Sequence, residues 1–231
     1  MAHIYVYSPS SAVRDKTAFR RGVKRLQALG HEVEVDEAAL AVQMRFAGDD
    51  ATRLAAIHRA AASGADVALI SRGGYGLTRI LPGIGYKKVA KAIEGGTRFV
   101  GLSDFTAFQL ALLARTGAVS WAGPALGEDF GVEGTPDDIM EACFDDLVQD
   151  QGEGTGWRLP AGRPSVAPET IADGGRPALA SGEKTIKNAL LWGGNLSVLV
   201  SLLGTPYWPQ VQGGVLFLED VNEHPFRIER M

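Results

Sequence analysis

The first 122 residues alternate between short apolar runs typical of β-strands and longer segments with helical spacing of apolar residues. This alternation predicts a parallel β-sheet with helices on both faces, because successive parallel strands must be joined by crossover helices. Gly30 and Gly64 follow two of the predicted helices as C-terminal stops. The predicted strands are 4–7, 31–35, 66–71, 98–102 and 119–122, and the predicted helices are 17–29, 49–63, 87–94 and 104–115.

The composition changes after about residue 150, where glycine and proline become frequent and the helical period is lost. We therefore expect an α/β domain of the Rossmann or flavodoxin-like class at residues 1–150 and a linker at 151–175. Residues 176–231 are predicted to begin a smaller, β-rich C-terminal domain. Within it, the stretch GGNLSVLVSLLGTPYWP predicts a helix and GGVLFLEDV predicts a strand.

Charge and motif content exclude several classes of function. The chain has a net charge of −4 and no run of basic residues longer than two, so we expect no nucleic-acid partner. Its one cysteine, Cys143, excludes an internal disulfide framework, and no metal-ligand spacing or nucleotide-binding glycine motif is present, so no metal or cofactor is expected. Without a secretory leader or an apolar run of about 20 residues, the chain is predicted to be cytoplasmic, with no membrane partner.

The sequence SRGGYG at residues 71–76 directly follows a predicted buried strand. Its three glycines permit positive φ angles and close backbone approach, and the exposed amides of such a loop can bind an anion. A tight strand-to-helix turn without any ligand explains the same residues equally well.

Ser103 stands between a predicted strand and a predicted helix, in the sequence GLSDF. One interpretation is a helix N-cap, and the other is a nucleophile raised by a sharp turn, although the G-x-S-x-G pattern is absent. Because Ser103 and the glycine loop both follow strands of one parallel sheet, we expect them to meet at the same edge. A hydroxyl beside free amides is the arrangement that acyl transfer requires.

A serine nucleophile also needs a base, and the chain contains four histidines. His3, His31 and His58 fall in contexts typical of solvated residues. His224 follows a strand and is the best of the four, although a surface role is the favoured interpretation for it too.

Five motifs in order resemble the LD-carboxypeptidase family, the muramoyltetrapeptide carboxypeptidases of serine peptidase family S66. They are SRGGYG, GLSD, WAGP at 121–124, LLWGGNLSVLVSLLGTPYWP at 190–209 and LEDVNEHPFRIERM at 218–231. The resemblance implies a homodimer that needs no cofactor, with its active site between two domains. It implies release of the terminal D-alanine from murein tetrapeptides in peptidoglycan recycling; a branch of the family cleaves peptide-nucleotide antibiotics.

The resemblance also assigns roles to particular residues. Ser103 corresponds to the nucleophile, and the amides of Gly74 and Asp104 correspond to the oxyanion hole. Arg72, Gly73 and Tyr75 are candidates for substrate binding, and Arg72 either pairs with a substrate carboxylate or holds its own loop through a salt bridge.

The chain departs from the family pattern at two places. Asn188 stands where the family has the glutamate of its Ser-Glu-His triad, and an amide lacks the charge that stabilises an imidazolium. The family's histidine comes beyond the motif that ends at Met231, so we expect a longer parent chain, a completing partner segment or a shortened relative. The alternative function is therefore a catalytically impaired muropeptide-binding protein.

Overall fold

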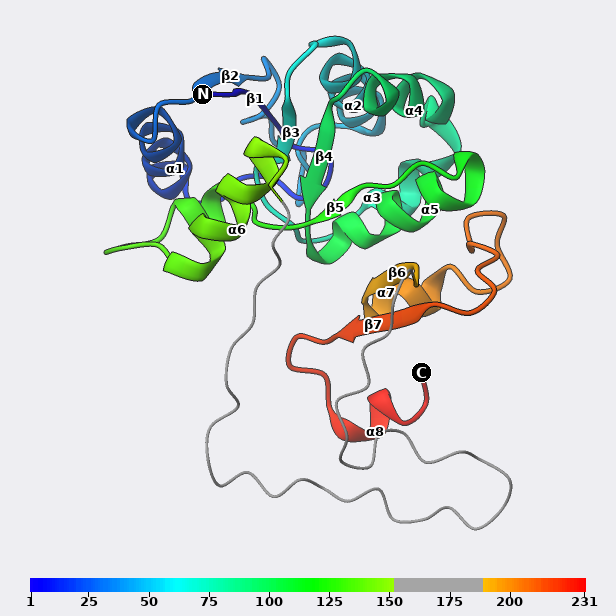
Figure 1. The fold of residues 1–231 in the computed structure, drawn as a ribbon. Helices are drawn as coiled ribbons and strands as arrows, with labels where there is room; N and C mark the ends of the chain where they lie inside the picture. The colour runs from blue at the N-terminus through cyan, green and yellow to red at the C-terminus, as the bar shows by residue number, and fades with distance from the viewer. Residues whose placement is uncertain (152–188) are drawn as a thin grey trace, which may run out of the picture.

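A computed structural model describes residues 1–151 and 189–231, and its main feature is a five-stranded parallel sheet (Figure 1). The strand order is β2-β1-β3-β4-β5, which confirms the predicted α/β class. In this order the chain reverses direction across the sheet between β1 and β3, and ligands of such folds bind beyond the carboxyl ends of the strands. The strands are β1 (His3–Tyr7), β2 (Glu32–Val35), β3 (Val67–Ile70), β4 (Arg98–Gly101) and β5 (Trp121–Ala122).

All four predicted helices of the first part are present, and Gly30 and Gly64 follow α1 and α2 with positive φ angles of 90° and 70°. Three short elements, α3, η1 and η3, were not predicted, because a helix of three to five residues is too short to show a period. The helices are α1 (Lys16–Ala28), α2 (Asp50–Ala62), α3 (Leu77–Ile80), η1 (Leu81–Gly83), α4 (Tyr86–Glu94), η2 (Ser103–Phe105), α5 (Thr106–Thr116), η3 (Leu126–Phe130) and α6 (Asp138–Gln149).

The central strands β1, β3 and β4 are buried between two layers of helices (Figure 1), whereas the edge strands β2 and β5 are largely exposed. Because side chains alternate across a strand, Ile4 and Val6 of β1 pack towards α1 and α6, whereas Tyr5 and Tyr7 pack towards α2, α4 and α5. Both faces of these central strands are therefore apolar, which explains why β3 appears in the sequence as a continuous apolar run.

The C-terminal segment adds β6 (Leu191–Asn195), α7 (Leu196–Ser201), β7 (Val215–Glu219) and α8 (Pro225–Ile228). β6 and β7 pair in parallel as a separate two-stranded sheet. The predicted helix and the predicted strand are both present, but β6 was not predicted, because Gly193 and Gly194 interrupt its pattern with φ angles of 131° and 128°. Residues 152–188, with most of the predicted linker, lie outside the described residues, and the domain boundaries stay predictions.

Helix α5 joins the C-terminal segment to the α/β part. The backbone N–H of Asn195, at the end of β6, donates to the buried hydroxyl of Thr106 over 3.0 Å. Leu199 and Leu202 pack into the same apolar cluster as Phe108 of α5. Residues of the C-terminal segment thus cover α5, the helix that follows Ser103, although Asn195 and Thr106 are 89 positions apart in the sequence.

The carboxylate of Asp104 connects the loops that follow three neighbouring strands. It is 3% exposed, and it accepts a hydrogen bond from the backbone N–H of Leu77 at 2.9 Å and another from the hydroxyl of Ser10. Burial raises the pKa of this carboxyl above its ordinary value, and the two hydrogen bonds and the nearby charge of Arg53 offset part of that effect. One buried acid therefore fixes the carboxyl edge of β1, β3 and β4.

Among the described residues, no helix has both the length and the apolar character needed to cross a membrane.

The raised pKa of Asp104 predicts how stability depends on pH. Because the folded chain binds this proton more readily than the unfolded chain, ionised Asp104 lowers stability at neutral pH, and stability recovers as the pH falls through the folded pKa. We expect Asp104→Asn, which keeps an acceptor for Leu77, to be more stable than the natural chain at pH 7. This advantage should shrink towards pH 4 in urea unfolding.

Asp104→Ala provides the matched comparison, because it leaves the Leu77 N–H and the Ser10 hydroxyl without their acceptor. We expect it to cost about 1–3 kcal/mol of unfolding free energy at pH 7. An Asn variant that loses as much stability as the Ala variant would contradict this account of the carboxyl.

Thr106→Val should loosen the C-terminal segment, because the isosteric side chain leaves the buried N–H of Asn195 without its acceptor. We expect a loss of about 1–3 kcal/mol in unfolding free energy and faster hydrogen exchange in β6 and α7. Thr97→Val is the control, because Thr97 is buried but its hydroxyl forms no hydrogen bond within the described part of the chain. Equal effects of the two substitutions would mean that the Thr106 bond does not hold this segment.

Candidate active site

Ser103 is the first residue of η2, at the sharp turn that follows β4. Its φ angle is 60°, in the left-handed region that residues other than glycine rarely adopt, whereas the preceding Leu102 is fully extended. The serine is half-buried, and its hydroxyl forms no hydrogen bond with any residue of 1–151 or 189–231. α5 begins after Phe105 and has no side-chain cap, so Ser103 does not serve as its N-cap.

The glycine loop after β3 lies directly against Ser103, as the sequence predicts. A Cβ atom at Gly73 would stand 2.7 Å from Cβ and 3.0 Å from Oγ of Ser103, closer than side chains pack. Only glycine allows the loop backbone to approach the hydroxyl this closely. The structure therefore brings together the two motifs that the sequence placed at one edge of the sheet.

The neighbouring Gly74 has a φ angle of 113° and faces Ser11. Ser11 follows Ser10, the serine in the loop after β1 that donates to Asp104. Ser11 accepts a hydrogen bond from the backbone N–H of Tyr75 at 2.9 Å, which fixes the loop from its other side. Neither the N–H of Gly74 nor that of Asp104 has a hydrogen-bond acceptor in the described part of the chain. These two amides keep their donor capacity for a ligand, and their assignment to an oxyanion hole stays a prediction.

Tyr75 projects from the loop with 58% of its surface exposed. Its ring stacks on Phe46 with centroids 6.0 Å apart, and the guanidinium of Arg45 lies 5.8 Å from the ring centroid. This aromatic surface beside the glycine loop is consistent with contact to a ligand, and its role in substrate binding stays a prediction.

Arg72 holds its own loop. One of its terminal nitrogens donates to the carbonyl of Ala12 at 3.2 Å, and the other lies 3.5 Å from a carboxylate oxygen of Glu128. The second oxygen of Glu128 accepts from the N–H of Gly73 at 3.3 Å. Sequence reasoning missed Glu128, because it lies on η3, where no motif or period distinguishes it, and only the fold brings it to the loop.

The histidines do not supply a hydrogen-bonded base for Ser103 among the described residues. His3 and His31 lie at the start of β1 and before β2, at the edge of the sheet opposite the serine. His58 accepts a hydrogen bond from the loop before α4, and burial lowers the pKa of both His31 and His58. His224 is exposed and stacks on its neighbour Phe226.

Asn188, at the position of the family's glutamate, lies outside the described residues. Cys143 is half-buried on α6, and the described residues contain no group of three or more metal-ligating side chains.

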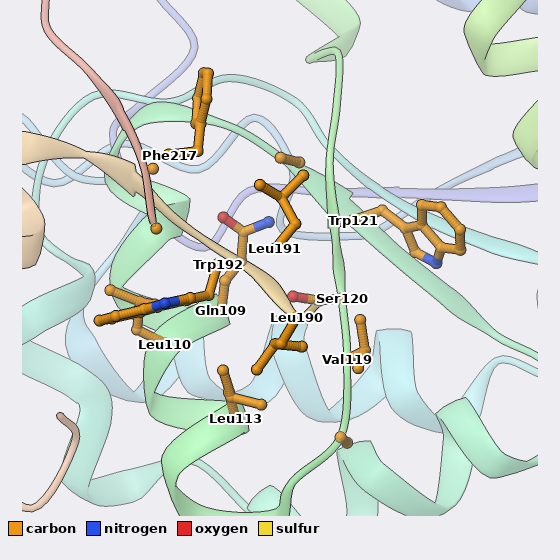
Figure 2. A pocket seen from close by; sticks show the side chains of 14 residues that line it. Gln109, Leu110, Leu113, Val119, Ser120, Trp121, Leu190, Leu191, Trp192 and Phe217 are labelled. Carbon is orange, nitrogen blue, oxygen red and sulfur yellow. The ribbon is translucent and has the colours of Figure 1, made fainter. Parts of the chain in front are cut away.

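A separate apolar hollow of about 320 Å³ lies between the α/β part and the C-terminal segment (Figure 2). Leu110 and Leu113 of α5, Trp121 of β5 and Phe217 of β7 line it, and Ser103 does not. Figure 2 shows Gln109 and Ser120 as its polar side chains among the leucines and tryptophans. The hollow is thus distinct from the serine and glycine-loop site.

Two family models match this chain. The model described as the LD-carboxypeptidase N-terminal domain matches residues 4–123, and the model described as the LD-carboxypeptidase C-terminal domain matches residues 188–231. The two matches include the β4 turn, the glycine loop and the segment that packs on α5.

Individual relatives agree with these matches. The probable murein peptide carboxypeptidase of Bacillus subtilis is 32% identical over 207 residues, which is 89% of this chain and 58% of that protein. The crystal structure of muramoyltetrapeptide carboxypeptidase from Oxalobacter formigenes superposes with a TM-score of 0.72 at 32% identity, over 99% of this chain and 69% of that one.

The microcin C7 self-immunity protein of Escherichia coli is 27% identical over 172 residues, which is 69% of this chain and 48% of that protein. A solved structure of the microcin C7 self-immunity protein gives a TM-score of 0.77 at 23% identity, over 99% of this chain and 71% of that one, and shares the fold. This chain spans 58% and 48% of the length of these two curated relatives. By its two domain matches and its relatives, the chain belongs to the LD-carboxypeptidase family.

Proposed function

We propose that this protein is a serine carboxypeptidase of the LD type that releases the terminal D-alanine from murein tetrapeptides. The observation that carries the proposal is Ser103, held in a left-handed backbone conformation against Gly73 with its hydroxyl free of partners among the described residues. A cytoplasmic role in peptidoglycan recycling and assembly as a homodimer are further parts of the same proposal.

The proposed reaction has two steps. Oγ of Ser103 attacks the carbonyl carbon before D-alanine, a base takes the hydroxyl proton, and the amides of Gly74 and Asp104 donate hydrogen bonds to the resulting oxyanion. Collapse of this intermediate breaks the C–N bond, and the proton passes to the leaving amine. Water then hydrolyses the acyl-serine ester and restores the hydroxyl.

The names of the relatives support the substrate class. The Bacillus subtilis and Oxalobacter formigenes relatives are named as carboxypeptidases of murein peptides or muramoyltetrapeptide, at 32% identity in each case. The microcin C7 self-immunity relative supports a second candidate, a hydrolase of peptide antibiotics. Asn188, in place of a triad carboxylate, supports a third, a binding protein with impaired catalysis.

Ser103→Ala tests the proposal directly. We expect the natural chain to release D-alanine from a murein tetrapeptide, and the variant to release it at least about a thousandfold more slowly, because the nucleophile is gone. Mass spectrometry of the released amino acid provides the measurement. Ser201→Ala, on the exposed face of α7, is the matched control and should retain full activity.

Other outcomes favour the other candidates. Binding of the tetrapeptide without release, unchanged in Ser103→Ala, would replace the peptidase proposal with the binding protein. Cleavage of a peptide-nucleotide antibiotic in preference to the tetrapeptide would favour the antibiotic hydrolase.

Gly73→Ala should disable the serine without unfolding the chain. The added Cβ would stand 2.7 Å from Cβ of Ser103 and must displace it, so we expect kcat to fall about a hundredfold with a smaller change in KM. Gly95→Ala, at the end of α4 with a φ angle of −79°, is the control substitution. Retention of natural kcat in Gly73→Ala, with circular dichroism and melting unchanged, would show that this contact does not position the nucleophile.

A further inference from the structure

The carboxylate of Glu128 lies against the glycine loop, at the same residue, Gly73, that contacts Ser103. Its two oxygens are held by two donors, the N–H of Gly73 at 3.3 Å and the guanidinium of Arg72 at 3.5 Å. An amide and a guanidinium together form a site for an anion, and in this structure the anion is a side chain of the protein itself.

The contact of Glu128 with Arg72 and the N–H of Gly73 is weak. Both distances are at the long end for hydrogen bonds of a charged pair, and the side chains of Arg72 and Glu128 are 25% and 44% exposed. Half-exposed ion pairs contribute little free energy, so another carboxylate can replace Glu128 at small cost.

The two donors stay in place when Glu128 moves. Arg72 is also bound to the carbonyl of Ala12 at 3.2 Å, and Gly73 is fixed against Ser103. The backbone of η3 is anchored by the N–H of Gly127, which donates to the carbonyl of Ser71 at 2.9 Å. Only the Glu128 side chain has to rotate away, and a preformed anion site remains beside the serine hydroxyl.

We propose that Arg72 and the N–H of Gly73 form the subsite for the α-carboxylate of the residue that is released, and that Glu128 occupies this subsite until substrate displaces it. The proposal rests on the proposed function, because a carboxypeptidase substrate carries a carboxylate on the residue that follows the scissile carbonyl. Gly73 contacts Ser103, so the subsite lies next to the reacting hydroxyl.

Glu128 thereby sets the affinity for substrate. A substrate carboxylate that approaches Arg72 meets a like charge, which opposes binding until the Glu128 side chain moves away. Glu128→Gln keeps the size of the side chain and removes its charge. The side chain at position 128 should then compete less well for the subsite, while Arg72 and the N–H of Gly73 stay unchanged.

The test is a calorimetric binding measurement in a Ser103→Ala background, in which no turnover occurs. The probes are an L,D-tetrapeptide that ends in D-alanine and the same peptide that ends in D-alaninamide. We expect Glu128→Gln to bind the carboxylate peptide about fivefold more tightly and the amide peptide with unchanged affinity. Glu133→Gln removes the same charge from an exposed position further along the segment and should change neither affinity.

Arg72→Gln supplies the complementary result. It should lower the affinity for the carboxylate peptide at least about tenfold and abolish the preference for this peptide over the amide peptide. Weaker binding of the carboxylate peptide to Glu128→Gln would overturn the proposal and assign Glu128 to a cationic substrate group. Unchanged binding of both peptides would overturn it as well, because Glu128 would then not occupy the carboxylate site.

Failure of the proposed function would have a different signature. If a chain with an intact Ser103 releases no D-alanine, the peptidase proposal is wrong. If Glu128→Gln still raises the affinity for the carboxylate peptide, the proposed subsite is nevertheless supported.

Discussion

The buried carboxylate of Asp104 is the interaction on which the site depends. Parallel strands bring their carboxyl ends to one edge, but this leaves the following loops free to adopt many conformations. Asp104 removes that freedom by accepting hydrogen bonds from Ser10, after β1, and from Leu77, after the glycine loop. Its burial makes ionisation unfavourable, so the chain gives up some stability to hold the edge in one conformation.

Close packing of the glycine-loop backbone against Ser103 shapes the candidate active site at this edge of the sheet. Gly73 lets the loop touch Ser103, and the serine adopts a left-handed conformation that its own side chain disfavours. Strain of this kind persists only where surrounding contacts determine the conformation, and here those contacts are the packing of Gly73 and the hydrogen bonds of the next residue, Asp104. The charged pair Arg72 and Glu128 borders the same contact and marks the proposed carboxylate subsite.

Family membership and local geometry both support the proposed function. The domain matches cover the α/β part and the segment from residue 188, while the geometry concerns single contacts around Ser103. The apolar hollow beside α5 belongs to neither argument, since its lining is mainly apolar and does not include Ser103. The glycine loop, rather than the hollow, is therefore the site on which the proposed chemistry rests.

The sequence by itself determined the strand and helix order, the helix stops at Gly30 and Gly64, and the meeting of Ser103 with the glycine loop, because these follow from periodicity and from parallel topology. It did not reveal β6, whose glycines hide the strand pattern, or the buried role of the Asp104 side chain. Only the tertiary structure decided that Ser103 caps no helix and that Glu128 reaches Gly73 from 55 residues away. Contacts between distant segments depend on how helices and loops pack in space, and no local pattern of residues records that packing.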